Sequence, residues 1–513
     1  MRDIIAKSLK LNRDLDKLLE KGLDEDRPVK IGWGQAGDER PKKGEIGVIT
    51  HLPKGGRVLC LGNLGECAGS MNRGGTFTLR GGASSMLGAY HVDGKILVER
   101  DVGPKVGFRM RGGEITIQGS VGDEAGAGMM GGAIVIRGHS GSKLGAGMSN
   151  GSIVVMGSVG SEPGVGMRGG RIFISGSCPP PGEGVNMRSI EDDEISEFTD
   201  ILDPLGLSLN EDALVLEAAR NLPAPAKIAE AYVTEGFDRI AFSPNDDPLS
   251  AHAPLDHYTL ILPMDSDAAG LLLPIPWLVE CESAEGWKGA LSESQPALVC
   301  SNPRKQDLLL VKEIGLSDSV SSLGDCSGMV FDITDFPGLN DAEIEALLVS
   351  LFSRMSESSL VFLRGSVDRI EHLFRLVVEL EMDGAVVDCS SPNGSRLAST
   401  LPRIGLASKA MSLAEHGKFV MMEIDEAPSA KDLLIAVAAG CHAVVAPLRN
   451  DDVEGCLDEA GSKLRGWMRE LGVDGIERVG RRNLRALDYD TAAVSGLRLI
   501  GYDRPLPMWL ELR

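Results

Sequence analysis

Few positions in the sequence have the residue types and spacing that a catalytic or cofactor site requires. One loop, Asp388-Cys-Ser-Ser-Pro-Asn-Gly394, follows an expected strand and could hold a ligand through Ser391, Asn393 and Gly394, because barrels place their sites at the carboxyl ends of strands. Arg449 follows a later expected strand and could contact a phosphate. For the loop, we favour an ordinary turn over a ligand site. For Arg449, we favour a solvent-exposed or salt-bridged side chain over a phosphate contact.

Other motifs in the chain do not predict chemistry. Two segments, Gly126–Gly131 and Gly164–Gly169, match GxGxxG, but each precedes an expected strand, whereas a dinucleotide site needs a helix N-terminus there. The sequence has no HExxH or Walker pattern, and its nine cysteines include no CxxC pair. We therefore expect buried thiols in a reducing compartment, with no metal site and no catalytic residue.

Composition narrows the class of protein further. The 513 residues carry 52 basic and 74 acidic side chains, a net charge of −22, which argues against nucleic acid or an anionic membrane as the main partner. No stretch approaches the roughly 20 apolar residues of a membrane span. The chain starts with a charged amphipathic segment, so we expect a cytoplasmic protein.

Any functional site must be positioned by the secondary structure around it. In the first third of the chain, that structure is set by a repeat of nineteen residues. Its glycines recur in three columns, the third interrupted by Arg100: Gly56, Gly75, Gly94, Gly113, Gly132, Gly151 and Gly170; Gly69, Gly88, Gly107, Gly126, Gly145 and Gly164; and Gly62, Gly81, Gly119, Gly138, Gly157 and Gly176. Glycine at fixed intervals indicates corners where φ is positive or a Cβ does not fit.

Between the glycines lies a short strand with two apolar positions per repeat. One column is Val58, Phe77, Ile96, Ile115, Ile134, Ile153 and Ile172, and the other is Cys60, Leu79, Val98, Ile117, Ile136, Val155 and Ile174. Two such side chains cannot form a core alone, so the repeats must stack. The sequence predicts a β-solenoid, a single-stranded β-helix of about seven turns, over residues 51–178. Met110, Met129, Met148 and Met167 share the period, and we expect a packing column there rather than a thioether metal ladder.

Flanking segments are expected to cover the open ends of this solenoid. Residues 3–22 have helical periodicity and could cap one end or dock on a partner. The acidic stretch Ile190–Phe198 and the helix-like stretch Asn210–Leu222 could cap the other end. We therefore divide this part of the chain into an N-terminal helix and cap (1–50), the β-helix (51–178), and a linker with an acidic cap (179–235).

Residues 236–513 alternate short apolar runs with helical stretches, which predicts a parallel sheet in an α/β domain. The expected helices include Asp341–Met355, Ser408–Glu415 and Val453–Leu471. About eight units allow a TIM-barrel-like closure. The expected strands are Tyr258–Leu262, Pro276–Glu280, Ala297–Ser301, Met329–Ile333, Leu360–Arg364, Ala385–Asp388, Lys418–Glu423 and Ala443–Ala446.

The nineteen-residue repeat, with its Pro-rich exit Cys178–Gly184, resembles the GXGXG domain that glutamate synthase large subunits share with one subunit of formylmethanofuran dehydrogenases. That resemblance implies a β-helix with a scaffolding role and no catalytic side chains. The second half resembles the FMN-binding barrel of archaeal-type glutamate synthases. The segments that carry this second resemblance are Phe237–Phe242, Ala253–Asp256, Asp383–Asp388, Ala427–Pro447, Leu464–Leu471 and Gly475–Glu477.

Departures from the flavin-binding pattern imply a degenerate barrel. Where the family has a Gly-Gly pair before the phosphate-binding helix, this chain has Glu423-Ile-Asp-Glu426, which brings bulk and like charge to the phosphate position. The next strand ends in Ala446–Arg449 instead of a Gly-Thr turn. Only Cys456 lies where the clustered cysteines of an iron–sulfur centre should follow. The resemblance also implies an N-terminal cysteine as the nucleophile of glutamine hydrolysis, whereas the printed sequence starts Met-Arg-Asp-Ile, so we do not expect that activity here.

Together these features predict a non-catalytic scaffold subunit of a glutamate-synthase-like or formylmethanofuran-dehydrogenase-like oxidoreductase complex, with other protein subunits as partners and no cofactor of its own. The alternative is an FMN-dependent glutamate-synthase-like subunit that transfers nitrogen to 2-oxoglutarate. That alternative would require Arg449, Ser391, Asn393 and Gly394 to hold the flavin.

Overall fold

The computed structural model describes residues 3–32, 44–219, 236–244, 247–255, 260–262, 271–356, 359–390, 396–449 and 451–502. The chain forms two units: Met1–Ala226 with Leu339–Ser353, and Lys227–Gly338 with Arg354–Arg513. The first contains a β-helix and the second a closed eight-stranded parallel barrel. The segment Leu339–Ser353 lies in the sequence between two barrel strands, yet it groups with the β-helix.

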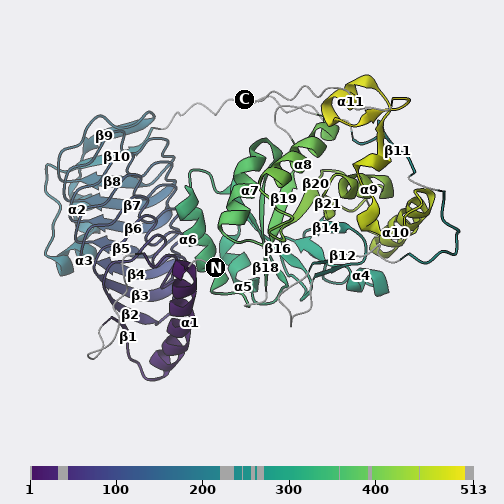
Figure 1. The fold of residues 1–513 in the computed structure, drawn as a ribbon. Coiled ribbons are helices and arrows are strands. Elements are labelled where there is room, and N and C mark those ends of the chain that lie inside the picture. Colours follow the sequence, from purple (N-terminus) through teal and green to yellow (C-terminus); the bar gives the residue numbers. More distant parts are fainter. Residues whose placement is uncertain are drawn as a thin grey trace. The chain divides into compact units, whose positions relative to one another are not determined.

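The β-helix is built as the repeat predicts, from stacked parallel strands (Figure 1). Val58 pairs with Phe77 and Ile115 with Ile134, so each strand matches the one nineteen residues later. Both apolar columns are buried in one core. The rungs are β1 (Val29–Ile31), β2 (Arg57–Leu61), β3 (Arg73–Arg80), β4 (Asp93–Val98), β5 (Glu114–Ile117), β6 (Met130–Ile136), β7 (Asn150–Val155) and β8 (Arg171–Ile174).

The glycines recur for the two expected reasons: a positive φ at some positions, and no room for a Cβ at others. Gly88 has φ +64°, and a Cβ on it would lie 2.6 Å from the Cδ1 atom of Ile115. Gly81 has no positive φ, but a Cβ there would collide with the carbonyl of Gly62 one turn below. The recurring methionines are fully buried in the same core, and the Cε of Met110 lies against Gly132. They form a packing column, as expected.

Helix α1 (Asp3–Asp24) covers the first end of the β-helix, where a cap was expected. Its side chains Leu15 and Leu19 join the solenoid core. Its polar side chains bond the following loop: Asn12 Nδ2 donates to the carbonyl of Gly47 (2.8 Å), and Asn12 Oδ1 accepts from the Ile49 N–H (2.9 Å). This pairing satisfies backbone groups that the cap would otherwise bury unbonded.

The prediction for the second end of the β-helix was wrong in two respects. The acidic stretch forms α2 (Asp192–Glu197) and is followed by α3 (Thr199–Leu202), but these helices cover a flank of the β-helix. Phe198 packs on Phe173 with ring centroids 4.7 Å apart, in a cluster with Val135 and Val154 on the outer face of β6 to β8. The stretch Asn210–Leu222 was expected to be helical, and this was wrong: β10 (Leu214–Ala218) pairs antiparallel with β8 and with β9 (Val185–Ser189). Edge hydrogen bonds with the last rung outweigh a weak helical periodicity.

Helix α6 (Asp341–Phe352) belongs to the β-helix unit. Its Glu343 side chain is 1% exposed and accepts from Lys105 Nζ at 2.6 Å. Farther along the helix, Ser350 Oγ lies 3.2 Å from Ser70 Oγ, and the carbonyl of Ser350 lies 3.0 Å from His51 Nε2. Polar contacts from two turns of α6 therefore fix it against the solenoid.

The barrel closes through eight parallel strands surrounded by helices (Figure 1). The strands are β14 (Trp277–Cys281), β15 (Ala297–Val299), β16 (Leu308–Val311), β17 (Gly328–Asp332), β18 (Leu360–Ser366), β19 (Gly384–Asp388), β20 (Phe419–Glu423) and β21 (Ala443–Pro447). The helices of this unit are α4 (Ala290–Ser294), α5 (Leu316–Ser322), α7 (Ile370–Glu379), α8 (Thr400–Ala410), α9 (Ala430–Ala438), α10 (Val453–Glu470) and α11 (Tyr489–Ser495).

Two expectations about the barrel elements were wrong. Of Tyr258–Leu262, the described residues form β12 (Leu260–Leu262), which pairs with β13 (Leu271–Leu273) outside the barrel. The missing barrel strand is β16, a run of four apolar residues. The helix expected at Ser408–Glu415 is α8, which ends at Ala410. A further sheet joins β11 (Ile240–Phe242), β22 (Leu484–Ala486) and β23 (Arg498–Leu499).

Candidate site at the carboxyl end of the barrel

On four neighbouring barrel strands, the last of the inward-facing side chains is charged. On each strand the charged residue stands two positions after an apolar residue of the barrel core, and side chains alternate between faces. The core residues are Val330, Phe362, Val386 and Met421. The charged residues are Asp332 on β17, Arg364 on β18, Asp388 on β19 and Glu423 on β20. We call these four residues the Arg364 cluster.

Arg364 holds the three carboxylates together. Its Nε donates to Glu423 Oε2 and its Nη2 to Glu423 Oε1, both at 2.6 Å. Its Nη1 donates to Asp332 Oδ2 at 2.6 Å, and Nη2 also reaches Asp388 Oδ2 at 3.3 Å. The two-point contact with Glu423 matches the planar fork of a guanidinium to a carboxylate. Every nitrogen of the Arg364 guanidinium thus donates to a carboxylate of the chain.

Turns that follow the strands orient the two aspartates. Asp332 Oδ1 accepts from the N–H and the hydroxyl of Thr334, at 3.0 and 2.6 Å. Asp388 Oδ1 accepts in the same way from Ser390, at 2.9 and 2.6 Å. Each carboxylate therefore keeps one oxygen on its own turn and directs the other toward Arg364.

The cluster is buried and carries surplus negative charge. The side chains of Asp332, Glu423 and Arg364 are 4%, 10% and 14% exposed. Burial raises the pKa of Glu423, and the charges of Asp388 and Glu280 add to this rise while Arg364 opposes it. Burial alone would lower the pKa of Arg364, but its bond to Glu423 and the surrounding carboxylates leave that pKa raised. One permanent cation therefore faces three acids.

The N-terminus of α9, where the flavin family binds phosphate, is occupied by side chains of the chain itself. Ser429 Oγ accepts from the Asp432 N–H at 3.3 Å, and Asp432 Oδ2 accepts from the Ser429 N–H at 2.8 Å. This capping box already places a carboxylate in the first helical turn. Arg449 is exposed and donates to the carbonyl of Ala427 at 3.3 Å.

These residues do not fit a flavin phosphate. A phosphate needs free N–H donors or a free cation at the helix N-terminus. Here Ser429 and Asp432 bring oxygen acceptors, and the nearby Arg449 bonds the carbonyl of Ala427. The guanidinium of Arg364, near the carboxyl end of β18, is bonded to carboxylates. Adding a dianion to this end of the barrel would place it beside surplus negative charge.

Of the residues that the sequence singled out, Ser391, Asn393 and Gly394 lie outside the described residues, and Arg449 contacts a backbone carbonyl. The structure instead brings together Asp332, Arg364, Asp388 and Glu423, which sequence reasoning missed as a group. A signal was available: in each of these strands a charged residue follows the inward apolar residue by two positions. Within the described residues, no group of three or more His, Cys, Asp or Glu side chains is arranged to hold a metal ion.

The fold and this site define a class: a two-unit protein with a β-helix and an eight-stranded barrel that carries a cluster of ion pairs at the carboxyl ends of four strands. No protein-family model matches the sequence, and no curated protein matches it. Among solved structures, a flavocytochrome b2 mutant is similar at 15% identity and TM-score 0.38, covering 54% of this chain and 85% of that chain.

Two further flavocytochrome b2 structures are similar at the same level. A variant with sulfite bound gives 17% identity and TM-score 0.38, covering 54% of this chain and 84% of that chain. A variant with benzoylformate gives 16% identity and TM-score 0.37, covering 48% of this chain and 76% of that chain. Likenesses this distant do not bear on the chemistry of this chain. In the part of the chain that the structure describes, no helix is both long and apolar enough to cross a membrane.

Proposed function

We propose that this protein is a non-catalytic scaffold subunit of an oxidoreductase complex of the glutamate-synthase-like or formylmethanofuran-dehydrogenase-like kind. The observation that carries the proposal is the Arg364 cluster, because its charged groups lie at the end of the barrel where barrel enzymes bind their substrates and are ion-paired with one another. A catalytic barrel leaves polar groups there for a ligand. Here those groups bond one another.

The intact β-helix supports the same proposal. Its strands pair in order from β2 to β8, and side chains from α1 and β10 join the core at its two ends, as a rigid support for other subunits requires. The sequence resemblance of this part is to domains that scaffold. The partners in this proposal are the cofactor-bearing protein subunits, and the protein binds no flavin of its own.

The test is the flavin content of the purified protein together with an FMN titration. We expect a colourless protein without stoichiometric absorbance near ~450 nm, and no saturable quenching of FMN fluorescence at micromolar concentration. The Arg449→Ala variant serves as a control and should behave like the parent. Stoichiometric flavin that is lost in the Arg449→Ala variant would overturn the proposal in favour of the FMN-dependent alternative.

A second arm tests the partner. An affinity tag on the protein in its native cells should recover flavin- or metal-bearing subunits in fixed stoichiometry, identified by mass spectrometry. Recovery of the protein without any cofactor-bearing subunit, under conditions that preserve complexes, would contradict the scaffold role.

A further inference from the structure

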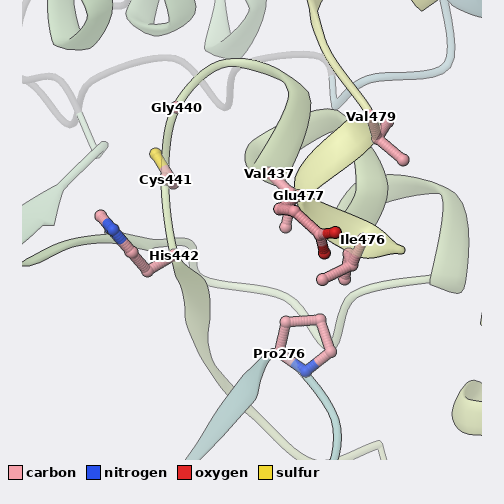
Figure 2. A pocket seen from close by; sticks show the side chains of 8 residues that line it. All are labelled: Pro276, Val437, Gly440, Cys441, His442, Ile476, Glu477 and Val479. Carbon is pink, nitrogen blue, oxygen red and sulfur yellow. The ribbon is translucent and has the colours of Figure 1, made fainter. Parts of the chain in front are cut away.

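A second concave site lies at the amino end of the barrel, away from the Arg364 cluster. A pocket of about 210 Å³ opens beside the residues that precede β14 and β21 and beside the C-terminus of α9 (Figure 2). It is lined by Pro276, Val437, Gly440, Cys441, His442, Ile476, Glu477 and Val479. A pocket of this size fits a small molecule of a few heavy atoms.

The pocket has aliphatic walls and one carboxylate. Pro276, Val437 and Ile476 direct their side chains toward the carboxylate of Glu477 (Figure 2). The neighbouring cation, Arg478, donates to Asp474 through Nη1, and its Nε lies 3.8 Å from Glu477 Oε1, beyond hydrogen-bond distance. Among the described residues no side chain donates a hydrogen bond to the Glu477 carboxylate.

Backbone dipoles add to the negative character of the pocket. Helix α9 ends at Ala438, and Gly440, with φ +102°, turns the chain back so that the Cys441 N–H bonds the carbonyl of Ala436. The carboxyl end of a helix carries partial negative charge and stabilises cations. A Cβ built on Gly440 would meet no atom within 4 Å, so this turn borders open space.

The adjacent Cys441 and His442 do not supply a nucleophile and its base. Burial raises the pKa of the Cys441 thiol to about 12, so the thiol stays protonated near neutral pH. His442 Nδ1 accepts from the Val420 N–H at 3.1 Å, and burial lowers the pKa of the ring. In Figure 2 both side chains point away from Val437 and Glu477. The pocket therefore has the features of a binding site without covalent chemistry.

We infer that this pocket binds a small aliphatic primary ammonium ion, with the charged nitrogen at Glu477 and the carbonyl end of α9 and with the alkyl group against Pro276, Val437 and Ile476. The apolar walls favour an alkyl group, and the carboxylate selects the cation over a neutral molecule of the same shape. The inference does not depend on the proposed scaffold role.

The experiment is a ligand-observed NMR titration of the full chain with isobutylammonium chloride and, as the neutral match, isobutyl alcohol. We expect saturable binding of the cation in roughly the millimolar range, and about tenfold weaker binding of the alcohol. Glu477→Gln should abolish this preference, whereas Glu379→Gln, which removes an exposed carboxylate on α7, should preserve it. Val437→Phe should fill the pocket and weaken both ligands.

Three results would overturn the inference. The first is equal affinity for the cation and the alcohol, and the second is a preference that survives in Glu477→Gln. The third is the absence of saturable binding up to ~100 mM, which corresponds to an affinity too weak for a site. Because Glu477 is 53% exposed, its variant is expected to fold, so a failure of Val437→Phe to fold would leave the Glu477→Gln comparison decisive.

Discussion

Replacing Arg364 by methionine is the sharpest perturbation of the barrel, because it removes the one cation that three buried carboxylates share. Methionine preserves much of the aliphatic volume and removes the four hydrogen bonds to Glu423, Asp332 and Asp388. Asp332 and Glu423, at 4% and 10% exposure, would then be buried without compensation. We expect this variant to destabilise the barrel unit strongly at neutral pH.

The expected loss follows from the burial of the cluster. Breaking a buried ion pair by removing one partner costs about 3–5 kcal/mol, which for a unit of this size lowers the melting temperature by roughly 6–20 °C. The loss should depend on pH. Burial raises the pKa of Glu423 and Arg364 opposes that rise, so without the guanidinium the folded-state pKa of Glu423 lies further above its unfolded value. The destabilisation is therefore absent below pH 4.5, the ordinary pKa of glutamate, and grows as pH rises.

The assay is urea denaturation followed by circular dichroism from pH 4 to pH 8, with hydrogen exchange to localise the effect to strands β17–β20. Arg375→Met, which removes an exposed i,i+4 partner of Glu379, is the matched control and should cost less than about 0.5 kcal/mol. The double variant Arg364→Met/Glu423→Gln should recover part of the loss. A loss equal to that of the control, or one that shrinks as pH rises, would refute the buried-cluster account.

Three further predictions concern the β-helix unit. Ile134→Asp places a charge in a fully buried column and should cost roughly 4 kcal/mol or more; an unchanged melting temperature in a soluble variant would contradict the stacked core. Lys105→Met leaves the 1%-exposed Glu343 without its cation and should cost about 3–5 kcal/mol in urea denaturation, whereas the exposed pair in Lys95→Met should cost less than about 1 kcal/mol. Hydrogen bonding from Arg188 lowers the pKa of Glu194 to about 2, so this pair stabilises the fold above pH 4.5 and the contribution is lost as pH falls toward 2. Glu194→Gln should flatten that acid transition in a pH titration followed by circular dichroism, and an unaltered transition would count against the pair.

The sequence by itself determined the β-helix, because its information is local and repeated. Each turn needs the same corner glycines and the same two inward side chains, so the period of nineteen residues fixes the strand pairing: Ile115 can lie only between Ile96 and Ile134. For the same reason, the nineteen-residue spacing of the four methionines was enough to predict that they stack as a packing column. The segment Leu214–Ala218 lies outside the repeat, so the spacing gives no information about it. Its strand conformation comes from antiparallel pairing with β8, the last rung of the repeat.

Only the tertiary structure decided which side chains meet in the barrel and which unit receives α6. Arg364 and Glu423 are 59 residues apart in the chain, and closure of the sheet brings their side chains to 2.6 Å. No local pattern specifies that pairing, since each strand alone shows only a charge after an apolar run. Glu343 likewise meets Lys105 across 238 residues, because α6 belongs to the β-helix unit although its sequence lies between two barrel strands.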